Sequence, residues 1–186
     1  MIRITGGKFK KKRIQSISQF VRPTSSLKRE AIFSIVKSYC IKNNYNLFEN
    51  KTILDLFAGI GTIGLEGISR GFSNVIFYEN NRKVLKILEK NCDMLCSKNQ
   101  YKIIEENIIL SSFSINFKNI SLIYIDPPYE KYNLNKLLLI LSKKIVEKSI
   151  IIIETSFNDV YVIPEKLKLI NEKKYGKTSI NFLTLL

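Results

Sequence analysis

The sequence predicts an α/β domain built on a mostly parallel sheet with helices on both faces. Short, almost wholly apolar runs of strand length alternate with longer segments whose apolar residues recur at helical spacing. Polar side chains, glycines or prolines follow several of these runs, as expected where parallel strands end at one edge of a sheet. The last two runs are joined only by Tyr175-Gly176-Lys177, which predicts a terminal β-hairpin and a total of seven strands.

The N-terminal segment predicts a basic β-hairpin followed by a helix. Residues 1–5 and 9–17 alternate apolar and polar side chains on either side of Gly6-Gly7, which predicts a hairpin with a Gly-Gly turn. One of residues 24–26 is expected to cap the helix. The buried stripe of this helix is expected to contain the apolar residues at helical spacing, which are Ala31, Ile32, Ile35, Val36 and Tyr39.

The remaining elements alternate along the chain. Strands are expected at 52–57, 74–78, 101–104, 120–125 and 149–154, with the terminal hairpin at 167–174 and 178–185. Helices are expected from the glycine-rich turn to about residue 70, at 81–97 and at 134–146, with a short helix or turn at 110–117. No internal repeat or long linker divides the sequence. We therefore expect one domain at 1–186, in which a hairpin and helix at 1–45 extend the sheet domain at 46–186.

Composition limits the class of protein. A chain of 186 residues with 45% hydrophobic residues suits one domain with a full core. No apolar run is long enough to span a bilayer and no apolar leader opens the chain, so we expect a cytoplasmic protein without a membrane partner. The absence of histidine excludes Ser-His and Cys-His nucleophiles, and three unpaired cysteines argue against a disulfide framework or a metal site.

The net charge of +14 is concentrated near the N-terminus. Residues 1–30 contain nine basic residues and one acidic residue, so they supply eight of the fourteen net charges. A basic cluster this one-sided predicts a polyanionic partner, most simply nucleic acid. The alternative is that a chain rich in Ile, Lys and Asn collects lysine without function. We expect phosphates to be contacted by the basic run, defined as Lys10, Lys11, Lys12 and Arg13.

The strand at 52–57 runs into a glycine-rich turn that predicts a nucleotide-like ligand. Gly59, Gly61 and Gly64 complete a G-x-G-x-x-G pattern between a strand and a helix, where the backbone can approach a ligand and the helix offers free N–H groups. The next strand ends at Glu79, where a carboxylate can accept bonds from ribose hydroxyls. The alternative for Glu79 is an ordinary solvated strand end.

Asp55 distinguishes two ligands that fit this pattern. A dinucleotide would place its pyrophosphate on the glycine turn, where the acid would repel it. S-adenosylmethionine has an ammonium and a sulfonium, which an acid attracts, so the sequence favours this ligand. The alternative for Asp55 is a strand-end residue bonded by the amides of the turn. Adenine is expected at the end of the strand at 101–104, where Asn107 and its rival Glu106 follow.

The strand at 120–125 ends in Asp126-Pro127-Pro128-Tyr129. The two prolines end the strand, which leaves a carboxylate, free carbonyls and an aromatic ring at the carboxyl edge of the sheet. These groups suit an amino group on a nucleobase, because the carboxylate and a carbonyl accept its N–H groups while the ring stacks on the base. The alternative is a rigid turn with Tyr129 as a packing residue.

These motifs resemble a known family. The sheet looks like a Rossmann-like class I S-adenosylmethionine-dependent methyltransferase, and residues 126–129 resemble the [DN]-P-P-[YF] box of enzymes that methylate exocyclic amino groups. More narrowly, the chain resembles the RsmD family nearly end to end. The likeness covers Arg3-Ile4-Thr5-Gly6-Gly7-Lys8-Phe9, Arg22-Pro23-Thr24, Arg29-Glu30-Ala31-Ile32-Phe33, 55–64, Leu65-Glu66, Ser69-Arg70-Gly71, Glu79, 126–129 and Lys174-Tyr175-Gly176. Two departures are Glu106-Asn107, where aspartate is usual, and Lys174, where arginine is common.

The resemblance implies methylation of the N2 amino group of one guanine in 16S ribosomal RNA, by direct in-line transfer to a flipped base. It implies catalytic roles for Asp126, Pro127, Pro128 and Tyr129. The expected cofactor site contains Asp55, Phe57, Ala58, Gly59, Gly61, Gly64, Glu79, Asn80 and Asn107. The expected RNA side contains the basic run together with Arg22, Thr24 and Arg29. The partner would be 16S rRNA or the small ribosomal subunit, bound by a monomer without a metal.

Three other functions remain open at this stage. Methylation of adenine N6 in DNA or RNA uses the same box chemistry, and only the N-terminal motifs argue for guanine. Methylation of a protein glutamine amide usually pairs with Asn before Pro-Pro and needs no basic arm. A non-catalytic RNA-binding assembly protein would not need an intact box. The modified nucleotide, and whether the substrate is naked rRNA or an assembled particle, cannot be identified from the sequence.

Overall fold

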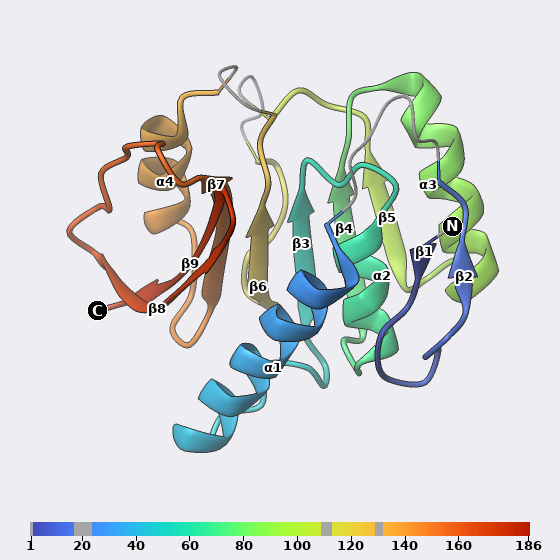
Figure 1. Ribbon diagram of the computed structural model, residues 1–186, viewed down its shortest axis with the longest axis horizontal. Helices are drawn as coiled ribbons and strands as arrows, with labels where there is room; N and C mark the ends of the chain where they lie inside the picture. Colours follow the sequence, from blue (N-terminus) through green and yellow to red (C-terminus); the bar gives the residue numbers. More distant parts are fainter. Residues whose placement is uncertain (1, 17–23, 109–112, 129–131) are drawn as a thin grey trace.

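The computed structural model describes residues 2–16, 24–108, 113–128 and 132–186 (Figure 1). A two-stranded sheet near the N-terminus contains β1 (Ile2–Arg3) and β2 (Arg13–Ile14). The helices are α1 (Ser26–Lys42), α2 (Thr62–Ser69), α3 (Arg82–Leu95) and α4 (Leu134–Ser142). The main sheet contains β3 (Thr52–Leu56), β4 (Asn74–Tyr78), β5 (Tyr101–Ile104), β6 (Ile120–Ile125), β7 (Ile150–Ser156), β8 (Leu167–Tyr175) and β9 (Thr178–Leu185).

The main sheet has a topological switch point at its centre. Its seven strands follow the order β5-β4-β3-β6-β7-β9-β8, and β9 runs antiparallel between β7 and β8. The chain moves from β3 out to β5 and then returns to the other side of β3 as β6. Ligands of open α/β sheets bind at the carboxyl ends of strands at such a point. The predicted sheet is confirmed, and every strand of it lies within two residues of its expected bounds.

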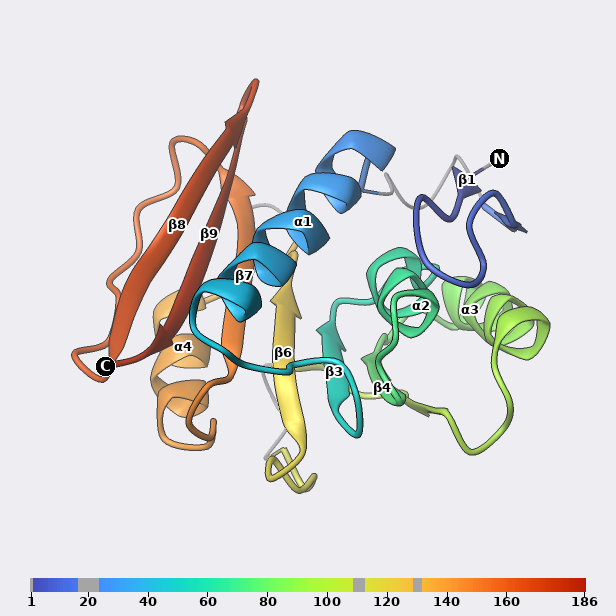
Figure 2. The ribbon, with the colours of Figure 1, turned by 90° about the horizontal axis from the view of Figure 1, so that it is seen from below.

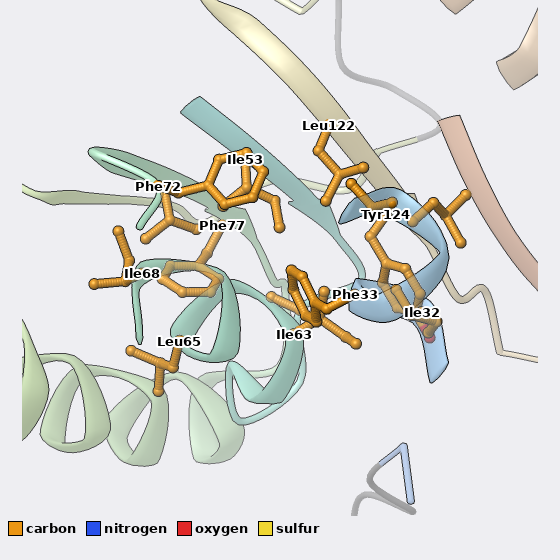
Figure 3. Packing of buried hydrophobic residues seen from close by; sticks show 14 of the residues in the cluster. Ile32, Phe33, Ile53, Ile63, Leu65, Ile68, Phe72, Phe77, Leu122 and Tyr124 are labelled. Atoms are coloured by element: carbon orange, nitrogen blue, oxygen red, sulfur yellow. The ribbon is translucent and has the colours of Figure 1, made fainter. Parts of the chain in front are cut away.

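Helices cover both faces of the sheet, as predicted. Figure 2 shows α1, α2 and α3 on one face and α4 on the other. Successive strand residues alternate between the two cores: Ile53 belongs to the cluster under α1 to α3, and Leu54 to the cluster under α4. In the first cluster, Phe33 of α1 and Ile63 of α2 lie together near Tyr124 of β6 (Figure 3). Close packing of both cores holds the strand ends in fixed positions.

The N-terminal hairpin differs from the prediction. Its strands have only two residues each, paired as Ile2 with Ile14 and Arg3 with Arg13, and a long loop joins them. Gly6-Gly7 is therefore not a two-residue turn. A Cβ on Gly7 would lie 1.8 Å from the carbonyl oxygen of Ser69, and the Gly7 φ is +76°. The glycine is needed because the loop packs directly on the end of α2, where the Lys8 amide donates to the same carbonyl at 2.7 Å.

The stripe predicted for α1 is wrong in part. Ser25 caps the helix, because its side chain accepts a bond from the Lys28 amide. The buried residues are Arg29, Ile32, Phe33, Val36 and Cys40, whereas Ala31, Ile35 and Tyr39 are only half-buried. The periodicity missed the start of the stripe because that residue is charged. Arg29 is buried because it has a carboxylate partner, Glu66, on α2. The buried face of α1 is therefore turned toward α2.

Two further elements are shorter than expected. The segment predicted as a helix or turn at 110–117 is described only from residue 113, and that part forms no helix. The helix α4 ends at Ser142, four residues before its predicted end. Among the helices of the described ranges, none has the length and apolar character needed to cross a membrane.

Candidate active site

The carboxyl ends of β3 and β6 enclose a small cavity at the switch point. Its volume is about 30 Å³, and its lining includes Thr24, Asp55, Phe57, Gly59, Tyr124 and Asp126. The acid of the Asp-Pro-Pro motif and the glycine turn, which are far apart in the sequence, therefore share one cavity. The acid is half-buried rather than sealed into the core. A groove of about 410 Å³ is lined by Pro127 and Pro128 together with Tyr132, Thr155 and Tyr161.

The glycine turn owes its shape to close packing on the sheet. Gly59 and Gly61 have φ values of +55° and +84°, and Gly61 is the residue before α2. A Cβ on Gly64 would lie 2.3 Å from the Phe77 ring, so only glycine lets α2 approach β4 this closely. The bulky Phe57 also has a positive φ of +65°, a conformation uncommon for such a residue, at the point where β3 turns into the cavity.

Asp55 is held by the first turn of α2. Its side chain is 2% exposed, and its Oδ2 accepts a hydrogen bond of 2.9 Å from the Gly64 amide. Burial raises the pKa of Asp55 well above its ordinary value, although the Gly64 bond opposes this, and the charges of Asp126 and Glu79 raise it further. The alternative interpretation of Asp55, in which an amide of the glycine-rich turn donates to its carboxylate, is thus observed. Asp55 nevertheless lines the cavity, so a contact with a bound cation stays a prediction.

Glu79 is oriented by backbone amides. Its Oε2 accepts from Gly59 at 2.9 Å, and its Oε1 accepts from the amides of Asn80 and Asn81 at 3.0 and 2.8 Å. The carboxylate therefore joins the end of β4 to the glycine turn. A carboxylate has about four acceptor positions, so these three bonds fix its direction and leave roughly one position for a ligand hydroxyl. Of the adenine candidates after β5, Glu106 is exposed and Asn107 half-buried, and the structure does not choose between them.

Asp126 faces a second acid. The parallel register pairs Ile125 with Ile153, which places the next residues, Asp126 and Glu154, side by side on neighbouring strands. Burial raises the pKa of Asp126 to about 8, the charge of Glu154 adds to this increase, and the charge of Lys28 opposes it. Asp126 is thus poised to change protonation near neutral pH. Tyr129 of the same motif lies outside the described residues.

The predicted RNA-binding residues separate into three groups. The basic run is exposed, and its loop lies at the end of α2 opposite to the glycine turn (Figure 1). Arg29 is only 2% exposed and bonded inside the protein, so the structure does not support direct RNA contact by this residue and instead gives it a role in holding the N-terminal segment. Thr24 lines the cavity, and Arg22 lies outside the described residues.

Sequence reasoning missed four residues in or near the cavity. Lys28, Tyr124 and Glu154 form a buried hydrogen-bonded group behind Asp126. A signal for Glu154 existed, because it ends the apolar run at 150–153 just as Asp126 ends the run at 120–125. Lys28 had no such signal, since one more lysine in a basic segment looks like solvated surface. Tyr132, whose ring packs edge-on against Phe57 with centroids 4.5 Å apart, was also missed.

Comparison with known proteins places the whole chain in one group. The model of a family described as "Conserved hypothetical protein 95" matches residues 2–184. A Haemophilus influenzae protein named "Ribosomal RNA small subunit methyltransferase D" is 27% identical over 96% of this chain and 91% of its own length. The structure named as a putative methyltransferase from Escherichia coli has a TM-score of 0.81 with 22% identity, covering 99% of this chain and 97% of that one.

A more distant structure shares the fold alone. It is an RNA methyltransferase from Salinibacter ruber, solved in complex with S-adenosyl-L-homocysteine. Its TM-score is 0.66 with 10% identity, and the match covers 88% of this chain and 94% of that one. The arrangement of strands around the switch point is therefore one that other proteins use for S-adenosyl ligands.

Proposed function

The chain belongs to the family described as "Conserved hypothetical protein 95", the RsmD family of S-adenosylmethionine-dependent methyltransferases, and from this membership we propose that it methylates the N2 amino group of a guanine in small-subunit ribosomal RNA. The observation on which the proposal depends is that Asp126 and the glycine turn line one cavity at the switch point. An acceptor for an amino group then lies next to the expected place of the methyl donor. The relative's name supports ribosomal RNA as the substrate.

The residues around the cavity fit the cofactor. Two acids, Asp55 and Asp126, line it, and a third, Glu79, contacts its glycine turn, so the site favours a ligand with positive charge. S-adenosylmethionine has such charges and supplies a methyl group on a sulfonium. We place it along residues 55–61, with its ammonium near Asp55 and its ribose near Glu79. The cavity itself, at about 30 Å³, has room for little more than a water molecule, so it marks only the innermost part of the proposed cofactor site.

The target base belongs beside the two prolines. In this proposal the Asp126 carboxylate and the Pro127 carbonyl accept the two N2 hydrogens, and Tyr129 stacks on the ring. These acceptors stabilise the positive charge that develops on the nitrogen as it is methylated, and no residue needs to form a covalent bond to the base. The groove beside Pro127 and Pro128, at about 410 Å³, is large enough to receive a flipped nucleobase.

The decisive experiment maps the methylated atom. Purified protein is incubated with methyl-labelled S-adenosylmethionine and small ribosomal subunits that lack base methylation, and in parallel with the naked 16S rRNA. The proposal expects label on N2 of a single guanine. Label on adenine N6 would support the alternative with the same box chemistry. Cofactor binding without transfer to any RNA would instead support a non-catalytic role.

A further inference from the structure

A part-buried ion pair lies on the side of Asp126 that faces the neighbouring strand β7. The Lys28 Nζ of α1 is 2.6 Å from Oε1 of Glu154 on β7, and their side chains are only 18% and 7% exposed. Lys28 also donates to the Thr178 hydroxyl at 3.1 Å. The ion pair therefore connects the N-terminal helix to the strand that runs beside β6. Glu154 is the neighbour of Asp126 in the parallel register. The Lys28–Glu154 ion pair is therefore adjacent to the proposed catalytic acid.

Tyr124 links this pair to the cavity itself. Its hydroxyl donates to Oε2 of Glu154 at 2.6 Å, and it lies two residues before Asp126 on the same face of β6. The Thr24 hydroxyl is 3.3 Å from the Tyr124 oxygen. Because the single hydroxyl hydrogen of Tyr124 is used in its bond to Glu154, Thr24 is the donor in the bond between Thr24 and Tyr124. Both carboxylate oxygens of Glu154 thus have a partner, which fixes the position of this side chain beside Asp126.

The charges that face this region are unevenly distributed. Around Asp126 they are Asp55 of β3, with Glu79 beyond it at the end of β4, then Tyr124 of β6, Glu154 of β7 and Lys28 of α1. Arg29 also faces Tyr124, but it pairs with Glu66 on α2. Among these groups, Lys28 is the cation directed at the pair of acids. Its removal would leave Asp126 and Glu154 side by side without the positive charge that acts on both.

We infer that Lys28 and Glu154 are positioning residues that together set the charge of Asp126, and that they thereby connect the N-terminal helix to the reacting amino group. The inference rests on the proposed function, because it assigns Asp126 the role of an ionised acceptor. Two carboxylates on adjacent strands resist simultaneous ionisation, as in other paired acids. The positive charge of Lys28 opposes the increase in the Asp126 pKa that burial and Glu154 cause, so it keeps the ionisation of Asp126 within reach of neutral pH.

The test uses two substitutions with opposite expected effects. In Lys28→Met the acid limb of the pH profile of kcat/KM should move to higher pH by about one unit, because Asp126 loses a nearby positive charge. In Glu154→Gln it should move to lower pH, because the neighbouring negative charge is gone while the amide oxygen can still accept from Tyr124. Lys28→Arg keeps the charge and should restore the profile. Lys37→Met, on the exposed side of the same helix, should leave it unchanged.

A purely structural role would give a different result. Both substitutions would then lower activity without moving the limb, or would move it in the same direction, and either result overturns the inference. If Glu154→Gln does not fold, the double variant with Lys28→Met removes both charges together and should return the limb close to that of the parent protein. A limb left at the position of the Lys28→Met single variant would contradict the inference.

A second measurement separates this inference from the proposed function. The carboxyl carbon of Asp126 is titrated by NMR in the unmodified protein, Lys28→Met and Glu154→Gln, with no substrate present. Opposite displacements of the titration midpoint support the inference even if no RNA is methylated. If methylation of guanine N2 is established but the midpoints coincide in all three proteins, the inference fails and the proposed function stands.

Discussion

Arg29 Nε lies 3.5 Å from Oε2 of Glu66, and the two side chains are 3% and 0% exposed. The Glu66 carboxylate also accepts bonds from the Thr5 amide and hydroxyl, the Gly6 amide and the Arg70 guanidinium, at 2.7 to 3.1 Å. Arg29 in turn donates to the carbonyls of Thr24 and Arg3. One buried carboxylate therefore holds together α1, α2 and the N-terminal segment, so three sequence motifs meet at one point.

Replacing Glu66 by Ala should destabilise the protein strongly. The substitution leaves the buried Arg29 charge unpaired and several donors unsatisfied, which typically costs about 3 to 5 kcal/mol. For a chain of this size the midpoint of thermal unfolding should fall by roughly 10 °C. Glu105→Ala is the matched control, because its ion pair with Arg82 is largely exposed and should change stability by less than about 1 kcal/mol. Equal midpoints for the two variants in calorimetry would contradict this role for Glu66.

Gly7→Ala should detach the N-terminal segment from α2. The new Cβ would overlap the Ser69 carbonyl at 1.8 Å, and alanine is also strained at the positive φ of this position. The control is Gly176→Ala, which has a positive φ of +59° but no atom within 4 Å of the new Cβ. That control measures the backbone strain alone, about 1 to 2 kcal/mol. Denaturant unfolding should show a clearly larger loss for Gly7→Ala, and a loss no larger than the control's would show that the close approach is unimportant.

Neutralising the basic run should weaken RNA binding and reduce its salt dependence. Changing Lys10, Lys11, Lys12 and Arg13 to Gln should lower the slope of log affinity against log salt by up to about 3, if all four side chains contact phosphates. Binding to 16S rRNA is measured at several salt concentrations. The control is the same change at the exposed lysines 143, 144, 166 and 168, which keeps the net charge equal. If both sets change the slope equally, the effect comes from net charge and not from this surface.

Asp126→Ala should abolish methyl transfer while leaving S-adenosylmethionine affinity within a few-fold. The reason is that Asp126 is proposed to contact the base rather than the methyl donor. Cofactor titration by calorimetry and single-turnover transfer to small subunits separate the two effects. Asp55→Ala is the comparison, because it should weaken cofactor binding first. Near-normal turnover in Asp126→Ala would remove the basis of the proposed mechanism.

Asp126→Asn should stabilise the protein more at high pH than at low pH. Burial raises the pKa of Asp126 to about 8 in the folded protein, far above the value of about 3.9 in an unfolded chain. Between these values the folded state binds a proton that the unfolded state does not, so the native stability falls as pH rises from about 4 to 8. Asparagine cannot ionise and removes this loss. The gain in unfolding temperature should be small at pH 5 and reach several degrees at pH 8.5, and a gain independent of pH would disprove it.

Much of the fold follows from local pattern. The strand at 120–125 was predicted with its exact bounds because its run, apolar except for Ser121, follows polar Lys118-Asn119 and is ended by Asp126 and two prolines, so both ends have a local cause. The hairpin at the N-terminus was predicted wrongly because a Gly-Gly pair can form a tight turn or can allow close backbone packing. Its alternation suggested strands, whereas the glycines serve a contact with Ser69, about sixty residues later. Contacts of that kind have no signature in the segment itself.

In the candidate site, too, some features have a local cause in the sequence and others depend on distant contacts. Asp55, Glu79 and Asp126 were identified because each lies at or just beyond the carboxyl end of a strand, and parallel topology brings those ends to one edge. The stripe of α1 was misjudged because Arg29 is buried, and burial of a charge depends on a partner that the local sequence does not reveal. Lys28 and Glu154 were missed for the same reason, since their 2.6 Å contact joins residues 126 positions apart.

By itself the sequence determined the order of elements, the parallel sheet, the glycine turn and the acids at the strand ends, because these depend on periodicity, proline and glycine chemistry, and topology. Only the tertiary structure decided which charged residues are exposed and which are buried in pairs. Arg29 and Lys28 stand next to each other in a basic segment, yet one pairs with Glu66 of α2 and the other with Glu154 of β7. A charge can be buried only where a partner compensates its lost hydration, and that partner is supplied by the folded chain.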